Sequence, residues 1–554
     1  MPQPFTITFL GGLGEIGRNC AVLEHDGELL LLDCGLMFPD LDMPGVDLVL
    51  PDFTYLREHR DQIVGCIATH GHEDHVGGLA FLLRDLSFPL YGSALTLGFA
   101  RNRIHEAGLL DRTEFITVHD GERRQIGHFD VEFIPVTHSV PQGFATAIRT
   151  PHGVVLHSGD LKLDLTPVDG RRTDIGRLGA IASSEGIRLY LGDSTNADEP
   201  GHSRSERTVG PVLERLFRQH AGRRIITTCF ASHVHRVQQI AEVAIASGRK
   251  VATLGMSMKK NVSLAREIGV LHLPDHALVD IDDVAGLDPG DVCIISTGSQ
   301  GEPMSALSLM AAGTSKWLEV GADDTVILSS HPIPGNEMNV TRVIDGLARR
   351  GVEVVHSGIE DVHATGHAKQ EELKTLLGLF QPEWFVPVHG EYRHLVAHAR
   401  LAQAMGIPAE RVIVCEDGDQ ITLDDADVHR SGRVSADYLY VDGLLDDVGH
   451  ALLRDRRTLA DEGVVVVFAT IDAARRKLLT APQIITRGWV YAPEAEPLVT
   501  ECADTVANAL TDALSTATEI DLDALQRTAR HATGQFVSSR TGRRPMIVPV
   551  VIEV

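Results

Sequence analysis

Four possible metal ligands fall within six residues of this chain, in the run His70-Gly71-His72-Glu73-Asp74-His75. The run follows an apolar strand pattern at 63–69 and precedes a helix-like stretch at 76–83. Ligands this close together cannot share one face of a helix, but a loop at a strand end lets them converge on two adjacent cations. Neutral imidazoles with a carboxylate suit Zn²⁺ or Mn²⁺, and the lack of thiolates argues against a purely structural zinc site. The alternative is a chance cluster in a polar loop.

Three further candidate ligands stand at the ends of other predicted strands: His138, Asp160 and His389. Each of them alone is more often a cap or a satisfied core group than a ligand. Together with the first cluster they complete a shared site, in which Asp160 is the natural bridging carboxylate. Two adjacent cations activate a water and hold the oxygens of a phosphodiester, so the pattern predicts hydrolytic chemistry.

A glycine pattern near the N-terminus resembles a dinucleotide fingerprint. Gly12, Gly14 and Gly17 follow a strand, and Asp33 ends the next apolar run. A dinucleotide site also needs a helix that starts at the glycines. Here the next strand begins almost at once, and Asp26-Gly27 marks a hairpin. We therefore interpret the glycines as a tight strand connection.

The pattern of apolar runs predicts an α/β protein with one domain inserted into another. Strand patterns dominate the first two hundred residues, strands and helices alternate from about 204 to 356, and the first style returns from 363 to 441. Alternating strands and helices are typical of a parallel sheet with crossover helices. After 442 there is enough sequence for a small α/β domain. The chain has 554 residues, which also suits several domains.

Composition excludes several classes of protein for this chain. No apolar stretch is long enough to cross a bilayer, and no secretory signal precedes the first strand. Seven scattered cysteines in apolar settings predict reduced thiols and a cytoplasmic location. A net charge of −26 argues against a nonspecific nucleic-acid coat protein. Residues 206–266 are locally basic, with eleven Lys and Arg against three acidic residues. A solvated helical face is the plainer interpretation of that stretch.

Beyond the ligand pattern, four longer motifs resemble those of the β-CASP nucleases within the metallo-β-lactamase superfamily, and in particular the bacterial ribonuclease J family. They are Gly192-Asp193-Ser194-Thr195-Asn196, the run from Ser329 to Glu337 that includes Pro334-Gly335-Asn336-Glu337, His363-Ala364-Thr365-Gly366-His367, and Pro387-Val388-His389-Gly390-Glu391. The resemblance covers essentially the whole chain. It implies a metallo-β-lactamase αββα sandwich with an inserted β-CASP α/β domain and a small C-terminal α/β domain.

The resemblance also implies domain boundaries. Residues 1–205 and 361–442 are the two parts of the metallo-β-lactamase domain, and 206–360 are the inserted β-CASP domain. Residues 443–455 are a linker, and 456–554 form a C-terminal oligomerisation domain. The locally basic stretch falls in the insertion, which favours a functional origin for its charge.

The family pattern assigns each ligand. His70, His72 and His138 hold one Zn²⁺, while Asp74, His75 and His389 hold a second, with Asp160 between the two ions and Mn²⁺ as the other candidate metal. Asp193 and His367 fall on the family's acid/base positions. A carboxylate and an imidazole beside the metals can divide proton transfer between them.

The same likeness implies two substrate contacts and an extra ion. The phosphate clamp is the turn formed by His363, Ala364, Thr365, Gly366 and His367. The second RNA contact is the loop formed by Ser232, His233, Val234 and His235, where many relatives carry Asn in place of His233. An additional Ca²⁺ or Mg²⁺ site would use the Gly45 carbonyl, Asp47 and Asp442, although both aspartates fit turns equally well.

We expect a cytoplasmic ribonuclease that acts both as a 5′→3′ exonuclease preferring a 5′-monophosphate and as an endonuclease, in RNA maturation and decay. Its expected partners are single-stranded RNA, further copies of the chain in a homodimer or homotetramer, and other RNA-decay enzymes, but no membrane. Three alternatives remain: a small-molecule hydrolase of the lactamase type, a β-CASP nuclease acting on DNA, and a scaffold in an RNA-degrading complex. The insertion and clamp argue against the first, and the complete ligand set against the last as a sole role.

Overall fold

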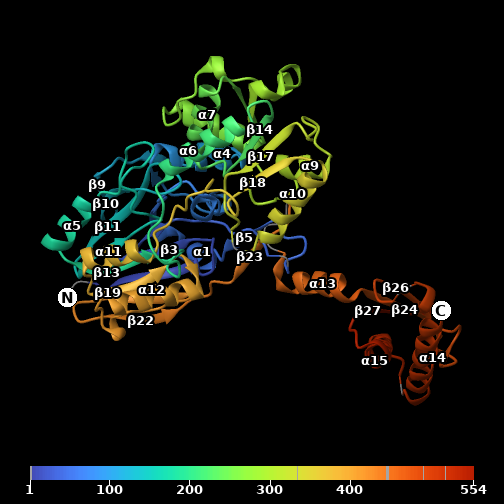
Figure 1. Cartoon of the computed structure of the whole chain (residues 1–554). Helices are drawn as coiled ribbons and strands as arrows, with labels where there is room; N and C mark the ends of the chain where they lie inside the picture. Colours follow the sequence, from blue (N-terminus) through green and yellow to red (C-terminus); the bar gives the residue numbers. More distant parts are fainter. Residues whose placement is uncertain (1–2, 41, 334, 444–447, 491, 518) are drawn as a thin grey trace. The chain divides into compact units, whose positions relative to one another are not determined.

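The computed structural model describes residues 3–40, 42–333, 335–443, 448–490, 492–517 and 519–554, and the side chains of 492–495 are not among the described ones (Figure 1). Pro334 of the Ser329–Glu337 motif and residues 444–447 of the expected linker lie outside this set. The chain forms two compact units. The first comprises 1–37 and 50–438, and the second comprises 38–49 and 439–554.

Two sheets build the metallo-β-lactamase part of the first unit. The eight-stranded sheet has the order β22 (Val428–Arg433), β21 (Asp419–Leu423), β1 (Phe5–Gly11), β3 (Cys20–His25), β4 (Glu28–Leu32), β6 (Ile63–Ile67), β7 (Leu90–Gly92) and β8 (Phe115–Thr117). The six-stranded sheet has the order β19 (Trp384–Val388), β13 (Ile187–Asp193), β12 (Gly153–His157), β11 (Gly143–Thr150), β10 (Phe129–Val136) and β9 (Arg123–Ile126).

The apolar faces of the two sheets pack against each other. Ile7, Leu30 and Ile67 from the first sheet share one buried cluster with Phe133 and Leu189 from the second. Helices α5 (Ile175–Ser184), α11 (Gln370–Phe380) and α12 (Tyr392–Ala404) cover the outer face of the second sheet through a further apolar cluster. On the other side, α4 (Ala94–Glu106) packs against α3 (Leu79–Asp85) and β7. The result is the predicted αββα sandwich.

Segments on both sides of the insertion complete these sheets. β1 pairs with β21, joining Phe5 to Leu423, and β13 pairs with β19, joining Leu189 to Trp384. The hairpin at Asp26-Gly27 is confirmed, because β3 and β4 pair antiparallel around these two residues. Both residues have positive φ, at 49° and 79°, as a two-residue turn of this hand requires. No helix separates β1 from β3 among the described residues, so the glycine pattern is a strand connection.

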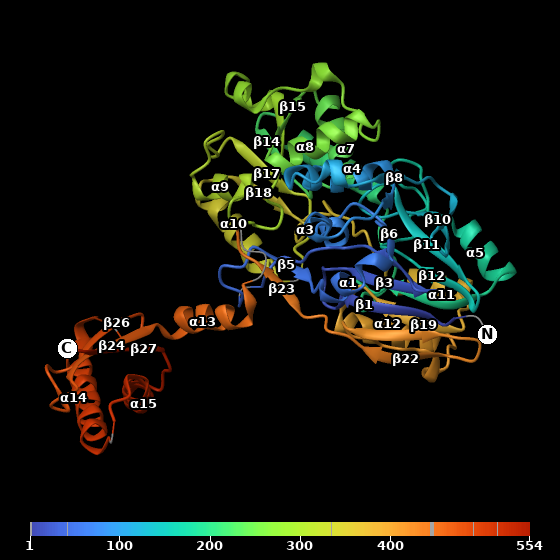
Figure 2. The same ribbon diagram turned by 180° about the vertical axis from the view of Figure 1, so that it is seen from behind.

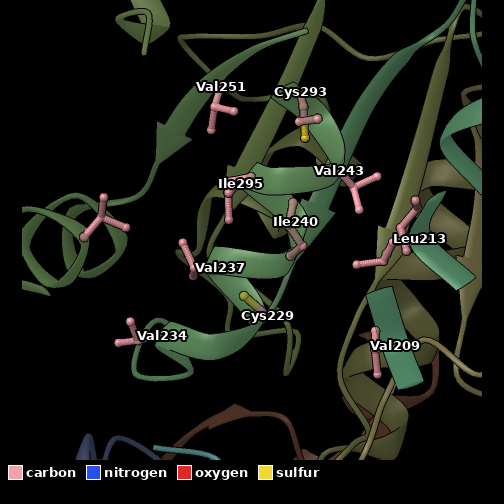
Figure 3. Packing of buried hydrophobic residues seen from close by; sticks show 14 of the residues in the cluster. Val209, Leu213, Cys229, Val234, Val237, Ile240, Val243, Val251, Cys293 and Ile295 are labelled. Atoms are coloured by element: carbon pink, nitrogen blue, oxygen red, sulfur yellow. The ribbon is translucent and has the colours of Figure 1, made fainter. Parts of the chain in front are cut away.

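The inserted segment folds around a parallel sheet of its own, drawn in green and yellow in Figure 1. Its order is β15 (Lys250–Leu254), β16 (Val292–Ser296), β14 (Arg224–Thr228), β17 (Asp324–Leu328) and β18 (Glu353–His356). Helices α6 (Val209–Gln219), α7 (Val234–Ala246) and α8 (Met256–Glu267) contribute to a core on one face, where Val237 and Ile240 meet Cys293 and Ile295 (Figure 3). Helices α9 (Ala306–Ala312) and α10 (Glu337–Arg349) cover the other face.

The second unit contains a four-stranded sheet. β24 (Val464–Asp472) lies between β27 (Met546–Glu553) on one side and β26 (Gln483–Arg487) and β25 (Lys477–Leu478) on the other. Helices α14 (Ala492–Thr516) and α15 (Leu522–Thr541) cover one face of the sheet, and the strand β24 alternates between buried and half-buried side chains. The two long apolar strands of this unit are therefore the central strand β24 and the edge strand β27.

Part of the expected linker is helical. α13 spans Gly449–Glu462, so residues 449–455 belong to a helix rather than to an extended connection. Val448 precedes the helix and forms no side-chain cap hydrogen bond. Within the described part of the chain, no helix combines the length and apolar content that a membrane span requires.

Candidate metal centre

The seven candidate ligands come from loops that follow strands of both sheets. β6 leads into His70 and the one-turn helix α2 (Glu73–Val76), which carries Asp74 and His75. β10, β12 and β19 lead into His138, Asp160 and His389. The structure brings all seven together in two groups that share Asp160 (Figure 2 labels the strands β6, β10, β12 and β19 that precede them).

The first group contains three imidazoles around Asp160. His72 Nδ1 lies 3.1 Å from His70 Nε2 and 3.1 Å from His138 Nε2. Asp160 Oδ2 lies 3.5 Å from His70 Nε2 and 3.9 Å from His138 Nε2. Ligand atoms at these separations can all reach one ion.

The second group lies on the other side of the same carboxylate oxygen. Asp160 Oδ2 is 3.2 Å from His75 Nε2 and 3.5 Å from His389 Nε2. Asp74 Oδ2 is 3.3 Å from His389 Nε2 and 3.7 Å from His75 Nε2. Asp160 therefore has the central position that we expected for it.

These side chains fit a pair of divalent cations. Asp160 Oδ2 is buried and has no hydrogen-bond partner, although four imidazole nitrogens face it. Two imidazole lone pairs 3.1 Å apart repel each other unless a proton or a cation lies between them. Nitrogen and carboxylate donors without thiolates are the set that catalytic zinc uses.

Other contacts fix which nitrogen of each ring faces the centre. His75 Nδ1 lies 2.7 Å from Asp33 Oδ2, and His138 Nδ1 lies 2.8 Å from the Gly366 carbonyl oxygen. An Nδ1–H donated to either oxygen leaves Nε2 unprotonated toward Asp160. Such outer contacts orient metal-binding histidines and tune their basicity.

Burial and charge divide the imidazoles into two classes. Burial lowers the pKa of His72 to about 4 and holds the pKa of His70 and His138 well below its usual value. Burial opposes charge at His389 too, but Asp160 and Asp74 outweigh it and raise the pKa of His389 to about 9. The first group thus presents neutral imidazoles, whereas a cation in the second group competes with protons.

Asp33 contacts a candidate ligand, His75, and the sequence analysis did not name it among the site residues. Its carboxylate accepts hydrogen bonds from the Thr69 backbone N–H at 2.7 Å and the Thr69 hydroxyl at 2.8 Å, besides its contact with His75. We had considered it only as part of the glycine fingerprint. The sequence does contain a signal for it. Asp33 stands at the end of the apolar run 29–32, just as the candidate ligand Asp160 follows the run 154–156.

Asp193 and His367 form a pair beside the two groups. His367 Nδ1 lies 2.8 Å from Asp193 Oδ2, and the His367 ring lies 4.8 Å from the His138 ring. Asp193 is 3% exposed and ends β13. Burial opposes the charge on each, but their mutual attraction lowers the pKa of Asp193 and raises that of His367, so they form an ion pair.

The expected phosphate clamp is tied directly to this centre. Asn196 Nδ2 donates to the Thr365 hydroxyl at 2.9 Å and to the His367 carbonyl at 3.2 Å. A Cβ on Gly366 would lie 2.6 Å from the His138 ring, so glycine is required there. His363 is at the opposite end of the turn, with its ring stacked on His331 at 6.2 Å. The turn is thereby held at a fixed distance from the ligands.

The loop expected to make the second RNA contact turns most of its side chains inward. His233 is 2% exposed, caps α7 through Arg236 N–H, and lies 3.5 Å from Glu206. Val234 packs in the core shown in Figure 3, and His235 lies 3.1 Å from Asp169. Of the four residues of this loop, Ser232 alone is half-buried and the other three are buried. This placement does not support the RNA contact expected at His233, because burial beside Glu206 removes that ring from the surface.

The expected extra divalent site already contains a cation of the chain. Arg456 Nη1 donates to the Gly45 carbonyl at 3.0 Å, and Arg456 Nη2 pairs with the Asp442 carboxylate. Asp47 Oδ2 accepts the Gly443 N–H at 2.7 Å. The guanidinium thus takes the place that we had assigned to Ca²⁺ or Mg²⁺, and these residues do not fit a bound divalent ion.

Much of the positive charge at 206–266 is matched by acidic residues from other segments. Pairs join Arg215 to Glu360, Arg224 to Asp324, Arg266 to Asp275, Lys260 to Glu106 and Arg223 to Glu353. Arg249 donates to backbone carbonyls, and Arg236 is buried against Glu206. The excess visible in the sequence is therefore largely neutralised in the fold.

Family models match four segments of the chain. Residues 13–206 match the metallo-beta-lactamase superfamily, and 222–347 match "Ribonuclease J, beta-CASP domain". Residues 351–413 match the "Zn-dependent metallo-hydrolase RNA specificity domain", and 451–554 match "Ribonuclease J C-terminal domain".

Full-length relatives agree with these segments. The chain is 41% identical to Ribonuclease J of Mycobacterium tuberculosis H37Rv, covering 100% of this chain and 99% of that protein. It is 40% identical to Ribonuclease J of Synechocystis, covering 99% and 86%. A crystal structure of a protein of unknown function from Enterococcus faecalis V583 superposes with a TM-score of 0.54 at 18% identity, over 76% of this chain and 100% of that one.

Proposed function

This chain belongs to the ribonuclease J family, and on that premise we propose that it is a metal-dependent ribonuclease acting on single-stranded RNA. The observation that carries the proposal is the centre of seven ligands beside the Asp193–His367 pair. The buried, unpaired cysteines are compatible with the cytoplasm, which we keep as the proposed location.

The proposed ligand assignment follows the two groups of side chains. His70, His72 and His138 would hold one Zn²⁺, and Asp74, His75 and His389 would hold the other, with Asp160 available to both and Mn²⁺ as the alternative metal. When bound, such a pair activates a water and neutralises charge on the phosphodiester. The distances around Asp160 support this division.

Proton transfer is assigned to the Asp193–His367 pair. Asp193 Oδ2 accepts from His367 Nδ1, which leaves Nε2 of that ring free to give a proton to the leaving oxygen. Asp193 also balances the charge of the ring. Proton transfer by a positioned side chain of this kind typically contributes about 10²–10⁴-fold to the rate.

The 5′ end of the RNA is assigned to the turn from His363 to His367. Its short backbone and the Thr365 hydroxyl can face an anion. Because Asn196 and His138 hold this turn against the centre, a 5′-monophosphate bound there places the cut a fixed distance along the chain. This supports a 5′→3′ exonuclease that prefers monophosphorylated ends. Endonuclease activity is proposed from the family likeness alone.

The deciding experiment compares four substrates with purified, Zn²⁺- or Mn²⁺-loaded protein: 5′-monophosphorylated RNA, 5′-hydroxyl RNA, DNA of the same sequence, and a lactam. We expect release of mononucleotides fastest from the first. The Asp74→Ala variant should lose cleavage while keeping its fold, because Asp74 lies in the one-turn helix α2 with 26% of its side chain exposed and is not part of the apolar core. Equal rates on DNA and RNA, or turnover of the lactam alone, would overturn the proposal.

A further inference from the structure

One hydroxyl joins the acid/base pair to the ligand groups. The Thr195 hydroxyl lies 2.8 Å from Asp193 Oδ1 and 2.6 Å from His389 Nδ1. Asp193 Oδ2 in turn binds His367, and His389 Nε2 faces Asp74 and Asp160. A continuous line of contacts therefore runs from His367 to the second ligand group through Thr195.

The direction of these hydrogen bonds follows from proton counting. A threonine hydroxyl has one proton to donate, and an ionised carboxylate can only accept. The hydroxyl must therefore donate to Asp193 and accept from His389 Nδ1–H. This arrangement leaves the lone pair of His389 on Nε2, which is the atom that faces Asp74 and Asp160.

Three candidate ligands each have an oxygen beside Nδ1. Thr195 provides it for His389, Asp33 for His75, and the Gly366 carbonyl for His138. Thr195 differs from the other two because its other bond goes to Asp193. The backbone adds a constraint at His389, whose φ of 55° lies in the left-handed region, so the ring is presented by a strained residue that needs an anchor. Among the described residues, Thr195 is the one side chain within hydrogen-bond distance of His389 Nδ1, and Asp193 Oδ1 lies farther away at 3.7 Å.

We propose that Thr195 is a positioning residue that fixes the ring of His389 for the second cation and couples that ion to the Asp193–His367 pair. The inference rests on the proposed metal-dependent function. It adds a residue that neither holds a metal nor touches the reacting atoms. Loss of the hydroxyl removes the acceptor for His389 Nδ1–H and a donor to Asp193 in one step.

The test uses Thr195→Val, which keeps the shape of the side chain and removes the hydroxyl, and Thr195→Ser, which restores it. Thr146→Val is the matched control, since Thr146 is fully buried in β11 and its hydroxyl has no hydrogen-bond partner. Zn²⁺ affinity and stoichiometry are measured by competition with a chromophoric chelator. Cleavage rates are measured over a pH series.

For Thr195→Val we expect one of the two ions to bind about 10–100-fold more weakly, as outer-contact changes usually cause. The other ion should bind as in the unchanged protein, and the pH profile of cleavage should shift. Thr195→Ser and Thr146→Val should retain both ions. Unchanged affinity for both ions in Thr195→Val overturns the inference. Fewer than two ions bound by the unchanged protein would instead count against the proposed two-metal centre.

Discussion

At the scale of single residues, the turn from His363 to His367 separates two tasks. Thr365 accepts a hydrogen bond from Asn196 and lies at the middle of the turn, whereas His367 contacts Asp193. A residue that holds the terminal phosphate affects substrates according to their 5′ end. A residue that moves protons affects every substrate alike.

We therefore predict that Thr365→Ala reduces the preference for 5′-monophosphate over 5′-hydroxyl RNA toward unity with a modest change in kcat. His367→Ala should depress kcat on both substrates by about 10²–10⁴-fold. Steady-state kinetics on the two RNAs check this. The role assignment fails if both variants change the two substrates in the same proportion.

A second group of charged residues lies at the loop after β1. Arg18 is fully buried and binds Glu15 at 2.7 Å and Asp417 at 2.8 Å, while its guanidinium stacks on Tyr438 at 4.2 Å. Two carboxylates share this single cation. Burial and the charge of Glu15 consequently raise the pKa of Asp417 to about 7.

This shift predicts a pH-dependent stability. An unfolded aspartate has a pKa of about 4, so between pH 4 and 7 the folded protein binds the extra proton. This contribution to the free energy of unfolding is complete below about pH 4 and is lost as the pH rises to about 7; its size is on the order of 4 kcal/mol. Glu15→Gln removes the negative charge that raises the pKa of Asp417, so the free energy of unfolding should fall less steeply with rising pH in this variant. Denaturant midpoints from pH 5 to 8 test this, with Tyr438→Phe as the uncharged control. Parallel slopes for Glu15→Gln and the unchanged protein would refute it.

At the scale of elements, the central strands of both sheets were predictable because they are apolar runs that end in glycine or a polar residue, as at 63–69 and 187–193. The ligand set was predictable for the same reason, since the ligands follow apolar runs of this kind. The polar edge strands β9 and β22 show no such pattern. The structure of segment 38–49 could not be predicted in this way, because its partners are some four hundred residues away in the sequence. Asp47 N–H, for example, donates to the Val441 carbonyl. Such pairing leaves no local pattern. The contact of Arg456 with the expected divalent site was not predictable either, because Arg456 lies on α13, whose first half falls in the expected linker 443–455.

The contacts of α13 with this segment give an element-scale prediction. Arg456 neutralises Asp442 and binds the Gly45 carbonyl, so added Ca²⁺ should leave the melting temperature of the unchanged protein as it is. Arg456→Ala frees these oxygens and should create a rise in melting temperature at millimolar Ca²⁺, the range of weak calcium sites. Arg457→Ala, which breaks a neighbouring pair with Asp42, is the control. Stabilisation of the unchanged protein by Ca²⁺ at these residues would restore the divalent site.

At the scale of the whole molecule, the sheet of the second unit presents an apolar face. Val466 lies between Ile485 and Val548 in the strand register, and the last two are 52% and 38% exposed. The helices α14 and α15 cover the opposite face. An exposed apolar row of this kind is typical of an assembly surface, and on this ground we propose that the sheet contributes to the expected homodimer or homotetramer.

We predict that Ile485→Glu combined with Val548→Glu lowers the number of subunits measured by light scattering and weakens activity on long RNA, while both metals stay bound. Leu459→Glu, at an exposed position of α13, is the control. Removal of everything after Asp447, itself outside the described residues, is the coarser version and should act in the same direction. An unchanged mass in both experiments would show that assembly uses another surface.

The pairing of β1 with β21 also sets an order of events on the ribosome. Phe5 leaves the exit tunnel early, but its partner Leu423 is made more than four hundred residues later, and His389 follows the whole insertion. At about 5–20 residues per second, β1 waits roughly 20–80 s for that neighbour. The parallel insertion can finish folding during this interval, because its five strands lie within 224–356. A nascent chain arrested before residue 389 therefore exposes a sheet edge and lacks one imidazole of the centre, so translation speed and chaperone capture become determinants of the yield of active protein.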